Sequence, residues 1–264
     1  MDNSSSQIPS TALITGASSG IGAEFANQLA AQGYGLVLVA RREDRLKGLA
    51  SDLEIKFQVP VEVIMADLSQ VPHLERVVSR VVELPNLQIL VNNAGFGLSG
   101  KFEQIDMRIH ELAIQLHVLA SVRLVHAVLP GMLARGGGSI INVASMAGLI
   151  PLRNVTYGAT KAYLVHFSRT LHQELLGSGV RVQALCPGFV YTEFHSSRPA
   201  PRSPRFMWST AERVVSASLA TLERDRVICV PGRIYRLIAA LGTSPLIFPL
   251  ISSAARLILP RRPS

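Results

Sequence analysis

Three side chains in the stretch "NVASMAGLIPLRNVTYGATKAYLVHFSRTL", at 142–171, could move a proton to or from a substrate oxygen. Tyr157 and Lys161 are four positions apart, so on a helix they share one face, one turn apart. A phenol is a poor acid or base at neutral pH, but a nearby ammonium favours the phenolate and lowers its pKa. The pair predicts a general acid for carbonyl reduction or a base for alcohol oxidation, with the Ser145 hydroxyl holding the substrate oxygen.

A second group with chemical meaning is the glycine turn "TGASSGIG" at 15–22, which separates an apolar run from a helical pattern. Without Cβ atoms the backbone can approach a pyrophosphate, and the helix N-terminus supplies N–H groups and a positive dipole. The spacing, Gly-x-x-x-Gly-x-Gly, is also compatible with a turn that binds nothing. Because a strand precedes it and a helix follows it, we expect a cofactor site that includes Gly16, Ser18, Ser19, Gly20, Ile21 and Gly22.

The residues after the second apolar run predict which dinucleotide binds. An acid there would bond the ribose 2′-OH, but this chain has Arg41 and Arg42, whose guanidinium groups suit a 2′-phosphate. We therefore expect NADP(H) rather than NAD(H), with Arg41 the better placed of the two. The alternative is that both arginines are solvated surface. Asp67, followed by Leu68, comes after the third run and could accept from an adenine amino group or cap a helix.

These residues need a scaffold, and the pattern of apolar runs predicts one. Several runs are continuous Val/Ile/Leu, as in parallel strands covered on both faces. Helical patterns separate them, so we expect an α/β fold with one doubly wound, Rossmann-type parallel sheet of about seven strands, in the order 3-2-1-4-5-6-7. The runs are Thr11–Thr15, Leu36–Ala40, Val61–Met65, Leu87–Val91, Ser139–Val143, Val180–Leu185 and Arg226–Val230, and the helical patterns include Ala23–Gln32, His73–Leu84 and Met107–Ala134.

Composition limits the partners and the compartment. The net charge of +8 lies entirely in 195–264, which holds 11 Arg and 3 acidic residues. No nucleic-acid-binding signature accompanies that charge, so we expect no nucleic acid partner. Cys186 and Cys229 lack metal-ligand spacing, and the N-terminus lacks a signal peptide, so we expect no metal and a reducing, cytoplasmic location.

Taken together, the motifs resemble the short-chain dehydrogenase/reductase family over roughly 10–230. They are TGASSGIG, NNAG at 92–95, the Ser145, Tyr157 and Lys161 set, and PGFVYT at 187–192. The spacing of Ser145 and Tyr157, ARREDRL and "LCPGFVYTEFH" are similar to a subgroup of largely uncharacterised bacterial members that use NADP. Such a resemblance implies hydride transfer between nicotinamide and a carbonyl or secondary alcohol, in a homodimer or homotetramer.

The resemblance also implies roles for individual residues. The glycines of the turn would bind cofactor phosphates, Lys161 would also hold the nicotinamide ribose, and Asn92 would lie near a cofactor ribose. Ala94 and Gly95 complete that motif beside the cofactor. The residues flanking the nicotinamide would be Pro187, Gly188, Val190 and Thr192.

One position departs from the family pattern. Members usually carry an Asn in the long fourth helix, where it orders a water linked to the lysine, but the aligned residue here is His117. Imidazole can still donate and accept, and it titrates near neutrality. We expect retained activity and a histidine pKa depressed by Lys161, with its ionisation visible in the pH–rate profile. The alternatives are a helix-packing histidine and a weakened protein that binds NADP(H) without turnover, as a regulatory or interaction partner.

The C-terminal quarter holds the predicted substrate lobe. Its loop, near 189–212, carries five large apolar residues that either pack in the core or line a cleft for a lipophilic substrate: Phe189, Phe194, Phe206, Met207 and Trp208. We divide the chain into a disordered tail (1–9), an oxidoreductase domain (10–232) and a basic, apolar extension (233–264). In that extension 238–255 carry no charge, and prolines argue against a straight membrane span. Two short helices there could lie on an anionic membrane at its inner face, cap the cleft or pack in a dimer.

Overall fold

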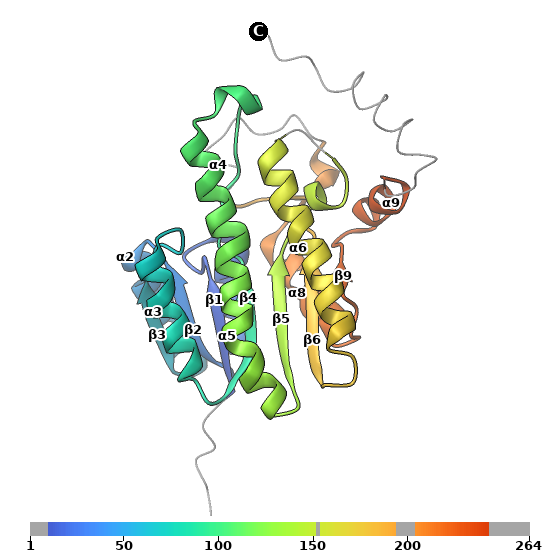
Figure 1. Ribbon diagram of the computed structural model, residues 1–264. Helices are drawn as coiled ribbons and strands as arrows, with labels where there is room; N and C mark the ends of the chain where they lie inside the picture. The colour runs from blue at the N-terminus through green and yellow to red at the C-terminus, as the bar shows by residue number, and fades with distance from the viewer. Residues whose placement is uncertain (1–9, 152–153, 194–203, 243–264) are drawn as a thin grey trace, which may run out of the picture.

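The computed structural model describes residues 10–151, 154–193 and 204–242, and its layers are shown in Figure 1. The predicted tail, 1–9, and most of the C-terminal extension, 243–264, lie outside the described residues. The strands are β1 (Thr11–Thr15), β2 (Gly35–Ala40), β3 (Val61–Met65), β4 (Leu87–Asn92), β5 (Gly138–Val143), β6 (Val180–Leu185), β7 (Phe189–Val190), β8 (Trp208–Ser209) and β9 (Ile228–Cys229). The helices are α1 (Gly20–Ala31), α2 (Glu43–Phe57), α3 (Val71–Val82), α4 (Met107–Ile114), α5 (Ala120–Ala134), α6 (Val155–Glu174), α8 (Ala211–Leu222) and α9 (Arg233–Gly242).

Seven strands form one parallel sheet in the order β3-β2-β1-β4-β5-β6-β9. This confirms the expected fold class and strand order, with β9 as the seventh strand. The chain adds β2 and β3 on one side of β1 and then crosses over to add β4 on the other side. The carboxyl ends of β1 and β4 therefore border the crevice in which doubly wound sheets bind ligands.

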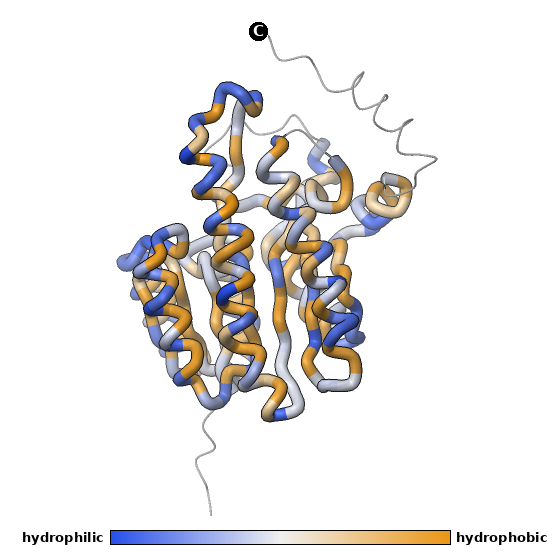
Figure 2. The backbone as a smooth tube through the Cα atoms, viewed as in Figure 1, coloured by the Kyte–Doolittle hydropathy of each residue, from blue (hydrophilic) through white to orange (hydrophobic). Residues whose placement is uncertain are grey.

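Both faces of the sheet are buried, which explains the continuous apolar runs. Along β1 the side chains alternate: Ala12 and Ile14 join the core under α1, α2 and α8, while Leu13 joins the core under α3, α5 and α6. In Figure 1 the second set of helices lies in front of the sheet. Figure 2 shows largely apolar strands and helices that carry polar residues on their outer sides.

The predicted helix Met107–Ala134 is continuous, but its middle is not α-helical. A π-helical turn, Gln115–Leu119, separates α4 from α5 and contains His117. Among the described residues this 28-residue stretch is the one long and apolar enough to cross a bilayer. Its apolar side chains, such as Leu124 and Met132, pack against the sheet, as expected for a core helix.

Some element boundaries differ from the sequence prediction. Helix α1 begins at Gly20 rather than Ala23, so Gly20, Ile21 and Gly22 of the glycine turn already belong to the first helical turn. The last strand is Ile228–Cys229 rather than Arg226–Val230, because it is an edge strand that pairs only with β6. Neither difference moves a predicted site residue away from the carboxyl edge of the sheet.

Candidate active site

The glycine turn packs so closely that Gly16 and Gly22 have no room for a side chain. A Cβ on Gly22 would lie 2.4 Å from the Gly16 carbonyl oxygen, and one on Gly16 would lie 2.9 Å from Ala94 Cα. Gly16 and Gly20 also have positive φ, at +65° and +59°, which favours glycine. The first turn of α1 contains no acidic residue and no side-chain cap. Its positive end is therefore suited to an anionic phosphate.

Asn93 braces this turn, a role that sequence reasoning missed. Its Nδ2 donates to the carbonyl oxygens of Thr15, at 2.9 Å, and Gly16, at 3.1 Å. The Thr15 hydroxyl accepts in return from the backbone N–H groups of Asn93 and Ala94, at 2.9 and 3.0 Å. These bonds join the end of β1 to the end of β4. Asn93 belongs to the NNAG motif, but the motif alone does not indicate this role.

The side chain of Asn92 lies instead inside the protein. It is 4% exposed, and its Nδ2 donates to Asn142 Oδ1 at 2.9 Å. Asn142 in turn donates to the Ser168 hydroxyl at 2.9 Å, which links β4, β5 and α6. Asn92 does not line the pocket described next, so its assignment to a cofactor ribose remains a prediction.

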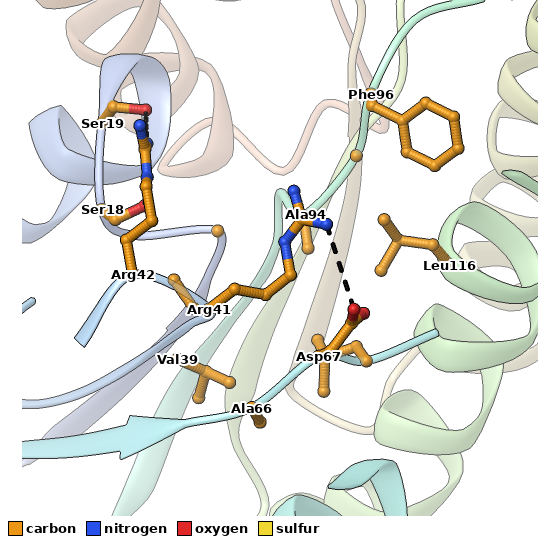
Figure 3. A pocket seen from close by; sticks show the side chains of 14 residues that line it. Ser18, Ser19, Val39, Arg41, Arg42, Ala66, Asp67, Ala94, Phe96 and Leu116 are labelled. Atoms are coloured by element: carbon orange, nitrogen blue, oxygen red, sulfur yellow. Dashed lines mark hydrogen bonds and ion pairs between the residues drawn. The ribbon is translucent and has the colours of Figure 1, made fainter. Parts of the chain in front are cut away.

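A pocket lies along the carboxyl ends of β1, β2, β3 and β4 (Figure 3). It brings together nine of the predicted cofactor residues: Gly16, Ser18, Ser19, Arg41, Arg42, Asp67, Leu68, Ala94 and Gly95. Phe96 and Leu116 add an apolar wall that sequence reasoning did not identify. The glycine turn, two arginines and apolar walls supply the phosphate-binding groups and the apolar contacts that an adenine dinucleotide requires.

Arg41 and Asp67 face each other across this pocket (Figure 3). The Arg41 side chain is 72% exposed, and its Nη1 lies 3.9 Å from Asp67 Oδ2. The other carboxylate oxygen of Asp67 accepts from the backbone N–H and hydroxyl of Ser69, at 3.0 and 2.7 Å. Asp67 thus stabilises the turn that it forms with Ser69 and does not cap α3, whose N-cap is Gln70.

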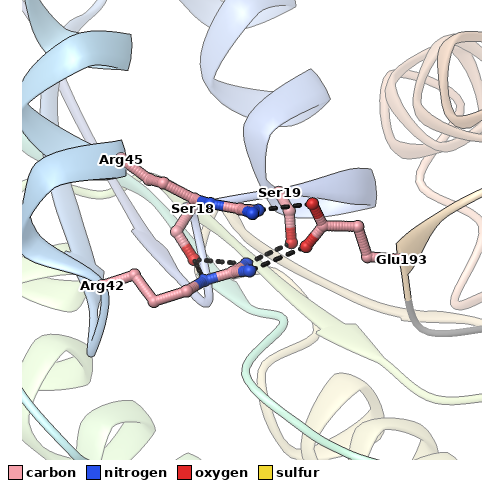
Figure 4. Close-up of polar contacts among 5 residues, drawn as sticks. All are labelled: Ser18, Ser19, Arg42, Arg45 and Glu193. Carbon is pink, nitrogen blue, oxygen red and sulfur yellow. Dashed lines mark hydrogen bonds and ion pairs between the residues drawn. The ribbon is translucent and has the colours of Figure 1, made fainter. Parts of the chain in front are cut away.

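Arg42 makes a different set of contacts (Figure 4). Its Nη2 donates to the hydroxyls of Ser18, at 3.0 Å, and Ser19, at 2.7 Å, on the glycine turn. Its Nη1 pairs with Glu193 at 2.7 Å, and Glu193 also pairs with Arg45. Hydrogen bonds from the two arginines lower the pKa of Glu193 to about 2, so this carboxylate is charged at any ordinary pH. Sequence reasoning missed Glu193, because no local pattern links it to Arg42.

The predicted catalytic residues lie on two elements in direct contact. Ser145 follows β5 and is the N-cap of a 3₁₀ turn, Met146–Gly148, where its hydroxyl accepts from the Ala147 N–H at 3.2 Å. Tyr157 and Lys161 lie near the start of α6. A Cβ on Gly148 would lie 2.5 Å from the Lys161 carbonyl oxygen, so the turn packs against this helix with no intervening side chain.

Lys161 connects the catalytic residues to the pocket. It is 5% exposed, and its Nζ donates to the Val143 carbonyl at 2.7 Å. The same nitrogen lies 5.8 Å from the centre of the Tyr157 ring and 3.7 Å from where a Gly95 Cβ would be. Burial lowers the Lys161 pKa to about 8, which leaves an ammonium at neutral pH. A charged group thus lies between the tyrosine and the pocket.

Comparison with known proteins agrees with this geometry. A family model of short chain dehydrogenases matches residues 10–202. An uncharacterised oxidoreductase of Staphylococcus epidermidis is 36% identical over 183 residues, which are 69% of this chain and 78% of that protein. The chain belongs to the short-chain dehydrogenase family. It is therefore an NAD(P)-dependent oxidoreductase with a Rossmann-type fold.

Two solved structures of this family resemble the whole molecule. The bulky-bulky ketone specific alcohol dehydrogenase from Comamonas testosteroni is 32% identical, with a TM-score of 0.79 over 98% of each chain. A short-chain dehydrogenase from Sphingobium yanoikuyae, in complex with NADPH, is 34% identical, with a TM-score of 0.81 over 97% of this chain and 98% of that one.

His117, which the resemblance aligns with a family Asn, is fully buried beside the predicted catalytic residues. Its Nε2 accepts from the Phe96 backbone N–H at 3.0 Å, so the proton of the neutral ring is on Nδ1. Nδ1 lies 2.9 Å from the Thr160 hydroxyl, which donates to the Tyr157 carbonyl at 2.9 Å. The imidazole also meets the Tyr157 ring edge-on, with ring centres 5.9 Å apart. His117 therefore holds the helix turn that carries the tyrosine.

The ionisation expected of His117 does not fit its surroundings. Burial, and secondarily the charge of Lys161, lower its pKa to about 2. The direction agrees with the sequence prediction, but burial is the larger cause. Because the imidazole then stays neutral under all working conditions, the prediction that its ionisation shapes the pH–rate profile is wrong on physical grounds.

The PGFVYT segment is held by α9 and by the glycine turn. The ring of Tyr235 covers Gly188, where a Cβ would lie 2.0 Å from the ring. The Tyr235 hydroxyl accepts from the Phe189 N–H at 3.0 Å and donates to the Met207 carbonyl at 2.7 Å. The Thr192 side chain lies 3.1 Å from where a Gly20 Cβ would be. Pro187 accepts from Met146 N–H at 3.0 Å, and Val190 is buried.

The predicted substrate lobe contains an aromatic stack. The Trp208 ring stacks on Phe189, at 5.3 Å, and on Tyr191, at 4.9 Å. Met207 packs with the ring of Tyr235 in a small apolar cluster, whereas Phe206 is exposed. Phe194 lies outside the described residues. Core packing thus accounts for Met207. Phe206 and the stacked rings leave aromatic side chains at the surface of the lobe.

Proposed function

We propose that the protein is an NADP(H)-dependent oxidoreductase that interconverts lipophilic carbonyl compounds and secondary alcohols. The observation that carries this proposal is the position of the buried Lys161 ammonium, next to both the Tyr157 ring and the Gly95 edge of the pocket. A proton-transfer group and a dinucleotide pocket are then neighbours, as hydride transfer coupled to proton transfer requires.

The residues present fit the cofactor. The backbone of Gly16, Gly20 and Gly22 would hold its phosphates at the start of α1, and Asp67 would accept from its adenine. Lys161 would hold the nicotinamide ribose, with Pro187, Gly188, Val190 and Thr192 beside the nicotinamide. When bound, the nicotinamide supplies or accepts the hydride.

The protein's own groups then handle the proton and the substrate oxygen. In the reductive direction the Tyr157 hydroxyl gives its proton to the oxygen, and the Ser145 hydroxyl holds that oxygen in place. The Lys161 ammonium stabilises the resulting phenolate. His117 positions this turn of α6 through Thr160 and moves no proton itself.

The preference for NADP(H) rests on Arg41 and Arg42. Both line the pocket after β2, and no acidic residue stands at the end of that strand. The exposed Arg41 guanidinium is oriented across the pocket, where a 2′-phosphate would be bound. The NADPH complex of the Sphingobium relative is consistent with this preference.

The lipophilic substrate class is supported by apolar side chains beside the catalytic helix. His110 contacts the Phe102 ring at 4.7 Å and the Thr156 hydroxyl at 2.7 Å, so Phe102 lies near the start of α6. Phe102 and Val155 are 53% and 64% exposed. These two exposed apolar side chains near Tyr157 favour a bulky apolar ketone, the substrate type in the name of the Comamonas relative.

The test is turnover of NADPH with a panel of bulky ketones, using Tyr157→Phe as the variant. This change keeps the ring and removes the proton, so turnover should fall by roughly two orders of magnitude or more, with NADPH still bound. Tyr163→Phe, on the same helix, should keep full turnover. If Tyr157→Phe reacts normally, the acid lies elsewhere; NADPH binding without turnover of any ketone by the unaltered protein would support a regulatory, non-catalytic role.

Assembly and membrane contact remain proposals of the same kind. We propose a homodimer or homotetramer, because family members commonly assemble in this way. Peripheral membrane contact would use 233–264, of which α9 (Arg233–Gly242) is described; its exposed residues include Arg233, Ile234, Arg236 and Leu237. Two arginines beside two apolar side chains suit an anionic lipid surface.

A further inference from the structure

Glu193 lies where three segments of the cofactor site meet (Figure 4). It follows Thr192 at the end of the PGFVYT segment, and its carboxylate reaches the beginning of α2. One of its oxygens pairs with Arg42 Nη1 at 2.7 Å, and the other pairs with Arg45. Through Arg42 the same carboxylate is connected to the serines of the glycine turn.

These contacts use every nitrogen of the Arg42 guanidinium. Nε donates to the Ser18 hydroxyl at 3.2 Å, Nη2 donates to both serine hydroxyls, and Nη1 donates to Glu193. A phosphate that binds Arg42 at Nη1 therefore competes with an anion already present. Arg41 differs, because its ion pair with Asp67 is long, at 3.9 Å, and its side chain is the more exposed of the two.

We propose that Glu193 is a specificity-determining residue that occupies the Arg42 position a cofactor 2′-phosphate would use, and so lowers the affinity for NADP(H) without lowering that for NAD(H). The proposal rests on the proposed cofactor preference and refines it. Arg41 is then the main anchor of the 2′-phosphate, and Arg42 contributes only as far as the phosphate displaces Glu193.

Charge supports this direction of the effect. A 2′-phosphate carries close to two negative charges at neutral pH, so a carboxylate on the same guanidinium repels it. The adenosine ribose of NAD(H) has a neutral hydroxyl at the same place and is not repelled. The carboxylate itself stays ionised, because its two arginine partners hold its pKa far below neutrality.

The experiment compares two probes that differ only in the 2′-phosphate: 2′,5′-ADP and 5′-AMP. Their dissociation constants are measured by calorimetry for the unaltered protein, for Glu193→Gln and for a control, Glu43→Gln. Glu43 is also exposed and close to Arg42, but it pairs with Lys47 at 2.8 Å. Both variants therefore remove one negative charge from the same region, and only Glu193→Gln removes a carboxylate that pairs with Arg42.

We expect Glu193→Gln to bind 2′,5′-ADP about two- to five-fold more tightly, the range set by the modest strength of exposed ion pairs. Binding of 5′-AMP should not change, and Glu43→Gln should resemble the unaltered protein. Unchanged or weaker binding of 2′,5′-ADP by Glu193→Gln would overturn the proposal, and so would an equal gain in both variants. If the unaltered protein bound 5′-AMP as tightly as 2′,5′-ADP and Glu193→Gln did not separate them, the NADP(H) preference itself would fail as well.

Discussion

At the scale of residues, burial decides which protons the site can use. Lys161 keeps its charge at neutral pH although it is buried, because its pKa falls only to about 8. His117, buried beside it, has its pKa lowered to about 2 and serves as a fixed neutral support. His117 thus presents a polar, uncharged group beside Lys161, as the asparagine of the family pattern would.

The buried neutral imidazole makes stability depend on pH. His117 has a pKa of about 2 in the folded protein and 6.5 as its ordinary value. Between these values the unfolded chain binds a proton at this position that the native protein does not. The contribution of neutral His117 to the free energy of unfolding is therefore fully present above pH 6.5 and is lost as the pH falls below that value. The free energy of unfolding should decrease by about 2 kcal/mol more in the unaltered protein than in His117→Asn between about pH 8 and pH 5.

Chemical denaturation at several pH values measures this difference. The exposed His166 on α6 provides the control, since His166→Asn should leave the pH dependence as it is in the unaltered protein. Parallel pH dependence for His117→Asn and the unaltered protein would contradict burial as the cause.

Arg41 gives a prediction about cofactor choice. Arg41→Asp reverses a charge that lines the pocket after β2, so NADPH binding should weaken by about ten-fold or more, since a charge-assisted contact is worth roughly 1.5–3 kcal/mol. NADH binding should change much less. Fluorescence titration with both cofactors is the measurement, and Lys56→Asp, at the far end of α2, is the matched charge reversal. Equal affinity of the unaltered protein for the two cofactors would refute the preference.

The sequence predicts some of these residues well and others poorly, for physical reasons. The turn glycines were predictable, because positive φ and backbone contact exclude other residues locally. The bracing role of Asn93 was not predictable, because consecutive residues at a strand end point in opposite directions and its partners lie at the end of β1, 77 and 78 positions away. Glu193 and Arg42 are 151 positions apart, so their pairing depends on the fold alone.

At the scale of elements, periodicity predicts where helices lie but not how they are wound. The apolar pattern indicated the helix 107–134, whereas the π-helical turn that places His117 against Phe96 has no periodic signature. Such turns are common at functional sites. Helix α9 was likewise expected as part of an extension, and it supports the PGFVYT segment through the ring and the hydroxyl of Tyr235.

Tyr235→Phe tests that support. The variant keeps the ring over Gly188 and removes two hydrogen bonds, so we expect a loss of about 1–3 kcal/mol in the free energy of unfolding. Hydrogen exchange of the Phe189 amide should also become faster, since its acceptor is gone. Tyr34→Phe should change neither quantity. If exchange at Phe189 stays slow in Tyr235→Phe, α9 does not hold this segment.

At the scale of the whole molecule, the strand order was predictable because apolar strands alternate with helices, which is typical of a doubly wound sheet whose crossovers share one hand. The length of the last strand could not be predicted, because an edge strand pairs with only one neighbour. The pocket belongs to this scale too. Its lining comes from the ends of four strands, so it exists only when the sheet has formed.

This dependence predicts that the cofactor stabilises the fold. A ligand that binds only the native protein adds about 2.7 kcal/mol at a concentration about 100 times its Kd. For a chain of this size that corresponds to a rise of roughly 5–10 °C in the melting temperature. NADH at the same concentration should give a smaller rise, because it lacks the phosphate that Arg41 would bind. Thermal melts of the unaltered protein and Arg41→Asp measure this: the difference between the cofactors should disappear in the variant, and an identical rise for both cofactors in the unaltered protein would contradict a 2′-phosphate site at Arg41.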